Sequence, residues 1–489
     1  MNWKSLTDRE LAILLEGERF KTVPMRHQLA TLAMSTALDR TFAWNDIGTG
    51  KSLVGLYAHQ IWRSKRILVV CPNCVLEGWA DQIRQHTDWR AEVLTGAMPE
   101  RLCRLLFSEA NVFVANYESL QYLFGKRTKG PDGKTKWNLD YAAVSNVNFD
   151  GLVIDEAHHI GNHQSIQSRC CRALSKAARH AILLTGTPIK TIDDKGKPYL
   201  DPAIWGMYDV LNGGSTLGAN RFRFLKAHFK QNYWGDWTVL PGGETKVLER
   251  IAPVTIRYSR AECFDLPERT YEDRQCDMTT EQADLTTQLV NGLEITLPEG
   301  SLKEQDDMHL ANKLAQVAGG LLILDNGAVH RLAKNPKLDL LMETLEDVGK
   351  VVVFHSFVEE GRMICERLAK AKIKYEAMRG DVADRNGWRR FNDDPGVRAL
   401  IAHPAAGGEG INLQGACSTM IFYSNGATGA AVRAQAEGRI WRHGQAERCL
   451  YLDLVLRKSV DEARLERTRD RAEAAEKLLG FIEKYRNSL

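Results

Sequence analysis

Leu152-Val153-Ile154-Asp155-Glu156-Ala157-His158 is the stretch of this chain that decides its fold. Three apolar residues, two of them β-branched, are followed directly by two acids. A short, continuously apolar run is typical of a strand that is buried on both faces of a parallel sheet. We therefore predict an α/β sheet with Asp155 and Glu156 at the end of a buried strand. That placement suits the chemistry of a magnesium–nucleotide complex.

A glycine-rich segment upstream, Gly48-Thr49-Gly50-Lys51-Ser52, supplies what the two acids need. Its amides would cradle phosphates, and Lys51 would neutralise the β- and γ-phosphates. Ser52 would bind Mg²⁺, and Asp155 would hold the same ion through its hydration shell, because Mg²⁺ keeps several waters in proteins. Glu156 is then the candidate for activating the attacking water. The two segments predict ATP and Mg²⁺ as cofactors.

Two series of short apolar segments divide the chain. The segments of each series alternate with helical stretches and are continuously apolar, as in parallel strands covered by helices. We therefore predict two α/β lobes, each built on a parallel sheet. The first series comprises residues 66–70, 111–115, 151–154 and 181–184, preceded by a strand at 41–44, and the second comprises 350–354, 398–402, 418–423 and 450–455.

The region between the two series, about residues 190 to 335, has few strand signals and is predicted to be a helical insertion. Within the first lobe, residues 126–136 carry five basic side chains among turn-forming residues. Charge runs are usually solvated, so we interpret this segment as a surface loop, with contact to phosphates as the alternative. The aromatic cluster 233–237 is interpreted as packing within the insertion, with base stacking as the alternative.

Composition places the chain among globular proteins. Its 489 residues are 44% hydrophobic and 26% charged, and no apolar run has the length that crosses a membrane. The first residues lack the apolar core of a signal peptide and predict a helix capped by Thr7 and Glu10, so the cytoplasm is the expected location. A net charge of +3 neither supports nor excludes a nucleic-acid partner. The ten scattered cysteines show no zinc-site pattern.

Polar residues of the first lobe would complete the nucleotide site. Gln28 carries an amide that is able to read both edges of adenine. Thr185-Gly186-Thr187 follows the fourth strand, where its hydroxyls would sense the nucleotide from the acidic box. His158 lies inside that box and would couple it to the neighbouring motifs.

The second lobe contributes a basic pair. Arg439 and Arg442 stand three residues apart, so on a helix they would share a face and reach a γ-phosphate as arginine fingers. Gly410 and Gln435 precede them and are candidates for nucleotide contacts.

These motifs, in this order, resemble the Swi/Snf-type branch of the superfamily-two helicase-like ATPases. The resemblance covers most of the chain, and Asn162 behind the acidic box is particularly similar to that family. Three departures are mild: Asn45 stands where a phosphate loop has its first glycine, Ser52 replaces a more frequent threonine, and Trp441 replaces a usual histidine. Further matching segments are 25–28, 70–72, 77–79, 116–118, 257–260, 265–268, 379–381 and 385–392.

The resemblance implies an α/β fold of two RecA-like parallel-sheet lobes, with helical insertions between them and a C-terminal helical brace. The expected domains are the first lobe with its N-terminal helix, a helical protrusion of that lobe, a linker with the protrusion of the second lobe, the second lobe, and the C-terminal helix. Their boundaries are residues 1–190, 191–260, 261–335, 336–458 and 459–489.

The resemblance also implies that double-stranded DNA is the partner and that the protein acts on it as a monomer, away from membranes. Loops after the strands would present amides and hydroxyls to phosphates, in contacts that are blind to sequence. For Trp79, Asn116 and Tyr117 the alternatives are helix packing and strand termination. The candidate DNA contacts are Pro72, Trp79, Asn116, Tyr117, His355, Arg379, Ala406 and Gly407.

The function that the resemblance implies is ATP-driven translocation along duplex DNA, remodelling DNA or protein–DNA complexes. One alternative is a strand-separating DNA or RNA helicase with the same catalytic residues. Another, from a different class, is a nucleotide-gated DNA-binding scaffold without motor activity.

Overall fold

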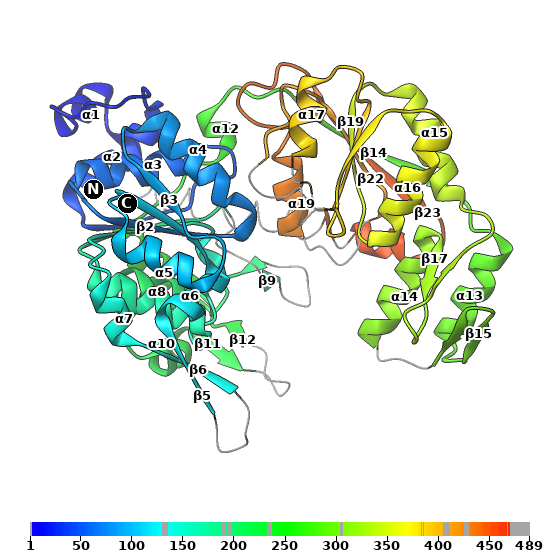
Figure 1. The fold of residues 1–489 in the computed structure, drawn as a ribbon, viewed down its shortest axis with the longest axis horizontal. Helices are drawn as coiled ribbons and strands as arrows, with labels where there is room; N and C mark the ends of the chain where they lie inside the picture. Colours follow the sequence, from blue (N-terminus) through cyan, green and yellow to red (C-terminus); the bar gives the residue numbers. More distant parts are fainter. Residues whose placement is uncertain are drawn as a thin grey trace. The chain divides into compact units, whose positions relative to one another are not determined.

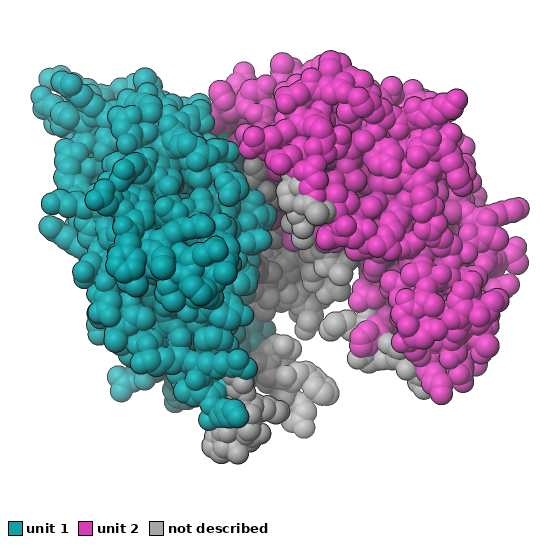
Figure 2. Space-filling view, in the orientation of Figure 1, with its two compact units in different colours: residues 1–263, 474–489 teal, residues 264–473 magenta. Residues whose placement is uncertain are grey.

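The structure is a computed structural model that forms two compact units (Figure 2). The described residues up to Cys263 form unit 1, and those from Phe264 onward form unit 2. No helix among the described residues has the length and apolarity that spanning a bilayer requires. The described residues are 2–129, 135–186, 191–192, 198–231, 237–303, 307–382, 384, 386–403, 411–424, 430–466 and 468–469.

Unit 1 is built on a seven-stranded sheet in which every neighbouring pair is parallel (Figure 1). The strand order is β13-β1-β8-β7-β2-β4-β3. The strands are β1 (Arg40–Ala43), β2 (Ile67–Cys71), β3 (Ala91–Val93), β4 (Val112–Asn116), β7 (Gly151–Ile154), β8 (His180–Leu184) and β13 (Thr255–Ile256).

Both faces of this sheet are buried, which explains why its strands are apolar throughout. In β7, Leu152 and Ile154 join one hydrophobic core while Val153 joins the other. One core contains residues of helices α1 (Asp8–Leu14), α2 (Arg26–Ala37), α3 (Lys51–Ile61) and α4 (Leu76–His86). The other contains residues of α5 (Met98–Phe107), α6 (Tyr117–Phe124), α7 (Tyr141–Asn146), α8 (Ile166–Ala177), α9 (Ile204–Asn212), α10 (Arg221–His228) and α11 (Gly243–Ile251).

Unit 2 repeats this design with six parallel strands in the order β14-β23-β22-β19-β21-β20. Val352 and Val353 of β19 again point into different cores. The strands are β14 (Arg269–Cys276), β19 (Val351–Phe354), β20 (Tyr375–Met378), β21 (Ala399–Ala402), β22 (Thr419–Phe422) and β23 (Cys449–Leu456). The helices of this unit's main body are α15 (Pro336–Asp347), α16 (Val358–Lys370), α17 (Gly387–Asp393) and α19 (Ala430–Glu437).

A smaller subdomain of unit 2 has a core of its own, to which Leu285, Ile295, Val317 and Leu322 belong. It contains two antiparallel hairpins besides its helices, in the region where the sequence predicts a helical protrusion. Its elements are α13 (Thr280–Val290), β15 (Ile295–Leu297), β16 (Gly300–Leu302), α14 (Asp307–Gly319), β17 (Leu321–Ile323) and β18 (Val329–Arg331).

The α/β fold with two parallel sheets is confirmed, and so are all eight principal strands and the preceding strand at 41–44. The capping box predicted at Thr7 and Glu10 is present at the start of α1. The predicted helical insertion at residues 190–335 contains helices, but β13 and β14 also lie there, and each forms an edge of a sheet. An edge strand keeps one side open to solvent, so β14 has the polar sequence Arg-Thr-Tyr-Glu-Asp-Arg-Gln-Cys.

The basic segment at 126–136 is described at residues 126–129 and 135–136, which are strands and not the predicted loop. It contributes to an antiparallel hairpin of β5 (Gly125–Lys129) and β6 (Thr135–Leu139) that projects from unit 1 (Figure 1). A helix begins at residue 460, as predicted, and the structure describes residues 460–466 and 468–469 of it. The remaining elements are β9 (Thr191–Ile192), β10 (Pro198–Tyr199), β11 (Phe229–Gln231), β12 (Trp237–Val239) and α12 (Arg260–Cys263). Residues 233–236 of the aromatic cluster lie outside the described residues.

Candidate active site

The loop between β1 and α3 has the geometry of a phosphate-binding loop. Gly48 and Gly50 adopt positive φ angles of 85° and 77°, a region in which side-chain-bearing residues are strained. Gly50 is the N-cap of α3, so the free amides of that helix face the loop. A Cβ atom at Gly50 would also lie 2.3 Å from Nε2 of Gln28. The glycine is therefore required both by its conformation and by its packing.

Lys51 is held over this loop. Its Nζ donates hydrogen bonds to the carbonyl oxygens of Asn45 (2.9 Å) and Asp46 (3.1 Å). Burial lowers the pKa of Lys51, while the negative charges of Glu156 and Asp155 oppose that shift. The structure thus places the lysine in the electrostatic field of both acids, as the sequence predicts for a shared nucleotide site.

Asp155 continues the line of β7, and its backbone N–H donates to Val70 O (2.8 Å). Its Oδ1 accepts a hydrogen bond from the backbone N–H of Glu156 (3.0 Å), and its Oδ2 accepts one from Nε1 of Trp79 (2.9 Å). Burial and the neighbouring charge of Glu156 raise the pKa of Asp155 to about 7. A cation beside this carboxyl would favour its ionised form, so the chemistry of Asp155 fits the predicted Mg²⁺ ligand. Ser52, the other predicted ligand, is the second residue of α3.

Glu156 occupies a left-handed backbone conformation with φ 48° and ψ 53°, which is uncommon for a residue with a side chain. Its Oε2 accepts a hydrogen bond from Oγ1 of Thr185 (3.4 Å) and lies 3.3 Å from Nδ1 of His158. Nδ1 of His158 is also 3.3 Å from Thr185 Oγ1. The structure therefore brings together Glu156, His158 and Thr185 in one cluster at the ends of β7 and β8.

Gly186 allows the end of β8 to approach the phosphate loop. A Cβ atom there would lie 2.7 Å from Cγ1 of Ile47 and 3.3 Å from Nζ of Lys51. A larger residue would displace the loop that carries Lys51. Thr187 lies outside the described residues.

Gln28 is buried, and its amide makes contacts within the protein. Its Oε1 accepts from the backbone N–H of Met25 (2.8 Å), and its Nε2 donates to Thr49 O (3.1 Å). Nε2 of His27 lies 2.8 Å from the same carbonyl oxygen. The structure therefore assigns Gln28 to positioning the phosphate loop and does not support the predicted reading of adenine.

Sequence reasoning did not identify three partners of the phosphate loop from the end of unit 1. Oδ1 of Asn45 accepts from the backbone N–H of Tyr258 (2.9 Å), and Oδ2 of Asp46 accepts from that of Arg260 (3.1 Å). Arg257 forms an ion pair with Asp46 (3.7 Å). The departure at Asn45 from the glycine of common phosphate loops thus has a structural reason. A glycine has no side-chain oxygen that could accept the hydrogen bond from the N–H of Tyr258. The match of segment 257–260 to the family was the available signal.

The structure argues against three of the predicted DNA contacts in unit 1. Trp79 is 2% exposed, and its indole N–H points to Asp155 instead of solvent. Tyr117 is 4% exposed, and its hydroxyl donates to Asp155 O (2.5 Å). Pro72 is buried. Asn116 stays partly exposed, and its Nδ2 donates to Asn73 (3.2 Å) and Glu118 (2.9 Å). Trp79 and Tyr117 therefore hold the acidic box in place by donating hydrogen bonds to Asp155.

Replacing Trp79 with phenylalanine is expected to raise the Mg²⁺ concentration for half-maximal ATP hydrolysis by about 10–100-fold, the usual cost of losing a partner that orients a metal-binding residue. Phenylalanine keeps an aromatic ring at this position but leaves Asp155 Oδ2 without its hydrogen-bond donor. Trp44→Phe is the matched control, because Trp44 is equally buried and its Nε1 donates to no group among the described residues. Equal Mg²⁺ requirements in the two variants would contradict this role of Trp79.

In unit 2, Arg439 and Arg442 do not share a helical face as predicted. Helix α19 ends at Glu437, and both arginines lie in the turns that follow. They nevertheless meet on one short segment: Nη1 of Arg439 donates to Ile411 O (3.5 Å), and Nη1 of Arg442 donates to Oδ1 of Asn412. Gln435 lies buried on α19. Gly410, Ala406 and Gly407 lie outside the described residues.

His355 and Arg379, the remaining predicted DNA contacts, both pack beside Gly361 of α16. His355 is 0% exposed, and burial lowers its pKa to about 4, so the structure argues against a phosphate contact by this side chain. Arg379 is mostly buried, donates to Gly361 O (2.9 Å) and forms an ion pair with Asp381 (3.1 Å).

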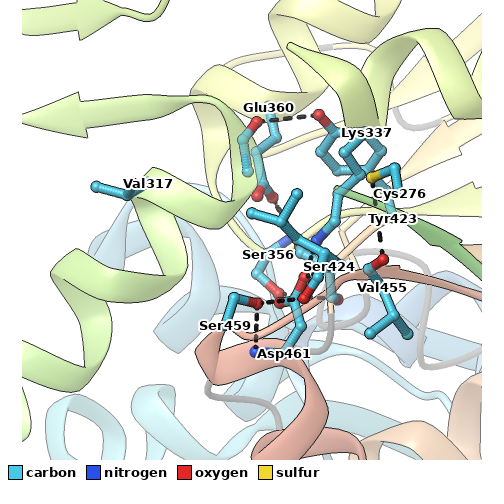
Figure 3. A network of polar contacts seen from close by, with 12 residues as sticks. Cys276, Val317, Lys337, Ser356, Glu360, Tyr423, Ser424, Val455, Ser459 and Asp461 are labelled. Carbon is cyan, nitrogen blue, oxygen red and sulfur yellow. Dashed lines mark hydrogen bonds and ion pairs between the residues drawn. The ribbon is translucent and has the colours of Figure 1, made fainter. Parts of the chain in front are cut away.

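The strand ends of β19 and β22 are joined by a buried acid. Oε2 of Glu360 in α16 accepts from the backbone N–H of Ser356 (2.9 Å) and of Phe357 (3.0 Å), and from Oγ of Ser424 (2.7 Å). Figure 3 shows these side chains beside a second buried group, Lys337 with Asp461. Glu360 thus fixes the backbone at the carboxyl ends of β19 and β22, which is the end of the sheet where the family-like motifs lie.

Comparison with known proteins agrees with this arrangement of motifs. A family model described as the SNF2-related domain matches residues 28–318, and one described as the helicase conserved C-terminal domain matches residues 336–444. Because the first match alone covers more than half of the chain, the protein belongs to the SNF2-related family. The resemblance to Swi/Snf-type ATPases is thereby confirmed, and the class of the protein is a helicase-like, ATP-using enzyme.

Individual relatives are distant. Protein p41 of Acyrthosiphon pisum secondary endosymbiont phage 1 is 22% identical over 407 residues, which cover 79% of this chain and 82% of the relative. The probable ATP-dependent DNA helicase CHR12 of Arabidopsis thaliana is 24% identical, with 87% of this chain and 39% of the relative covered. Among solved structures, the Sulfolobus solfataricus SWI2/SNF2 ATPase core in complex with dsDNA matches at 19% identity and a TM-score of 0.44, covering 92% and 91% of the two chains. The chain thus spans well under half the length of the plant relative.

Proposed function

We propose that this protein is a DNA-dependent ATPase that translocates along double-stranded DNA. The proposal rests on the cluster at the ends of β7 and β8. There His158 and Thr185 hold Glu156, and the negative charge of Glu156 interacts with Lys51. Such a cluster provides a base for an attacking water and a cation for the phosphates. Family membership supports DNA as the partner.

The chain's own residues would divide the reaction as follows. The loop amides and Lys51 would bind the phosphates, and Ser52 and Asp155 would hold Mg²⁺, which would neutralise phosphate charge. Glu156 takes a proton from water, while Thr185 and His158 keep its carboxylate in place. Arg439 and Arg442 would act as arginine fingers, as the resemblance to the family implies. Their joint contact with residues 411–412 supports a common role for the two arginines.

ATP hydrolysis measured with duplex DNA, single-stranded DNA, forked DNA and RNA at stated salt tests the proposal, because nucleic-acid affinity depends steeply on salt. We expect duplex DNA to stimulate hydrolysis most, with displacement of a triplex-forming strand and no separation of the duplex. Stimulation by single strands or RNA would favour a strand-separating helicase instead. Hydrolysis that no nucleic acid stimulates would contradict the proposal and favour a nucleotide-gated scaffold.

A further inference from the structure

The β5–β6 hairpin is an exposed basic ribbon to which none of the family motifs assigns a role. The side chains of Lys126, Arg127, Lys129 and Lys136 are all exposed. Lys126 forms an ion pair with Asp140 at the base of the hairpin (3.0 Å), and Lys129 and Lys136 form none with the described residues. In the described part of the two strands there is no acidic residue. The hairpin therefore presents positive charge to solvent.

The register of the hairpin distributes these cations over both of its faces. Directly paired residues of an antiparallel ribbon share a face, and neighbours along a strand alternate. Arg127 pairs with Trp137 and Lys129 pairs with Thr135 on one face, whereas Lys136 pairs with Thr128 on the other. Both faces of the outer ribbon therefore carry cations, and its apolar side chain, Trp137, lies on the face of Arg127.

The base of the hairpin is closely packed. A Cβ atom at Gly125 would lie 2.3 Å from Gln121 O and 3.1 Å from the ring of Trp137, so the glycine lets the ribbon leave α6 at close range. The ring of Trp137 packs edge-on against Tyr122 with 5.1 Å between centroids. The N–H of Asp140 closes the base by donating to Phe124 O (2.8 Å). Close packing at the base limits the directions that the ribbon can take, which reduces the entropy lost on binding.

We propose that the β5–β6 hairpin is a second contact with duplex DNA and that it lies in the major groove. A major groove is about 12 Å wide and admits a two-stranded β-ribbon, whose strands are about 4.8 Å apart. Phosphates border the groove on both sides, so a ribbon with cations on both faces meets both backbones. The contact is electrostatic and independent of sequence. This inference rests on the proposed function, because it takes duplex DNA as the partner.

The test is a full-length variant with Arg127→Gln, Lys129→Gln and Lys136→Gln, which leaves the Lys126–Asp140 pair at the base intact. Each lost phosphate contact reduces the slope of log affinity against log salt by about 0.9, so three lost contacts reduce it by about 2–3. Affinity for a short duplex is measured by fluorescence anisotropy at several salt concentrations. The matched control, Arg9→Gln with Lys65→Gln and Lys176→Gln, removes the same charge from exposed positions elsewhere in unit 1 and should keep the wild-type slope.

Methylation of guanine N7 reports directly on the groove, because N7 lies in the major groove. The wild-type protein should protect guanines that the triple variant leaves reactive. An unchanged salt slope or unchanged protection in the triple variant, with wild-type hydrolysis still stimulated by duplex DNA, would overturn the hairpin contact alone. Wild-type protein that neither binds duplex DNA nor responds to it would overturn the proposed function, and the hairpin contact with it.

Discussion

Replacing Glu156 with glutamine is expected to reduce the rate of ATP hydrolysis by about 10²–10⁴-fold, the usual contribution of a general base, while ATP binding is retained. Glutamine has the shape of glutamate, and its carbonyl oxygen still accepts the hydrogen bond from Thr185. Its amide nitrogen cannot accept a proton from water. The structure therefore predicts loss of turnover without loss of the fold.

The charge change at Glu156 also acts on its neighbour. Glu156 is one of the groups that raise the pKa of Asp155 to about 7, so removing its negative charge lowers that pKa. A larger fraction of Asp155 is then ionised at neutral pH, and binding of Mg²⁺ with ATP should not weaken. Single-turnover hydrolysis and nucleotide binding, measured on the same preparation, separate the two effects. Glu16→Gln, at an exposed position, is the control, and wild-type turnover in Glu156→Gln would disprove the assigned role.

Replacing Lys337 with methionine is expected to lower the free energy of unfolding of unit 2 by about 3–5 kcal/mol, the usual effect of breaking a buried ion pair from one side. Lys337 is 0% exposed, and its Nζ donates to Oδ2 of Asp461 (Figure 3). The same Oδ2 accepts from the backbone N–H of Leu456 (3.1 Å). Without the lysine, a carboxylate remains buried without its counter-charge.

A second change should reverse most of that loss. Lys337→Met with Asp461→Asn removes both charges but keeps an acceptor for Leu456, so we expect stability near that of the wild type. Lys370→Met, at an exposed position, should change stability by no more than about 0.5 kcal/mol. Urea denaturation measures the effects, and hydrogen exchange of the β23 amides assigns the transition to unit 2. A single variant as stable as the wild type would contradict the expected cost of the unpaired acid.

The central strands could be predicted from the sequence because burial on both faces leaves an unbroken apolar run. The edge strands could not. β14 is polar and mostly exposed, and β13 has only two residues, so neither carries that signal. Their places follow from pairing with β23 and β1, which are distant in the sequence.

Part of the candidate site could likewise be predicted from the sequence, and part could not. Lys51, Asp155 and Glu156 were predictable because each belongs to a short contiguous motif whose chemistry is local. The hydrogen bond from Trp79 to Asp155 spans 76 positions and depends on the packing of α4. The helical face expected for Arg439 and Arg442 was wrong because the backbone beyond Glu437 turns more tightly, with the N–H of Arg439 donating to Ala436 O (3.0 Å).

The connector between the two units has unequal anchors, and this matters for mechanical load. On one side, β14 pairs with β23 along eight residues, so a pull along the strand is resisted by many hydrogen bonds in shear. On the other side, β13 pairs with β1 over only two residues, and the chain that leaves it is held by Asn45 and Asp46. Tension in residues 264–268 acts equally on both anchors, so the weaker one, whose side-chain acceptors belong to the phosphate loop itself, should yield first.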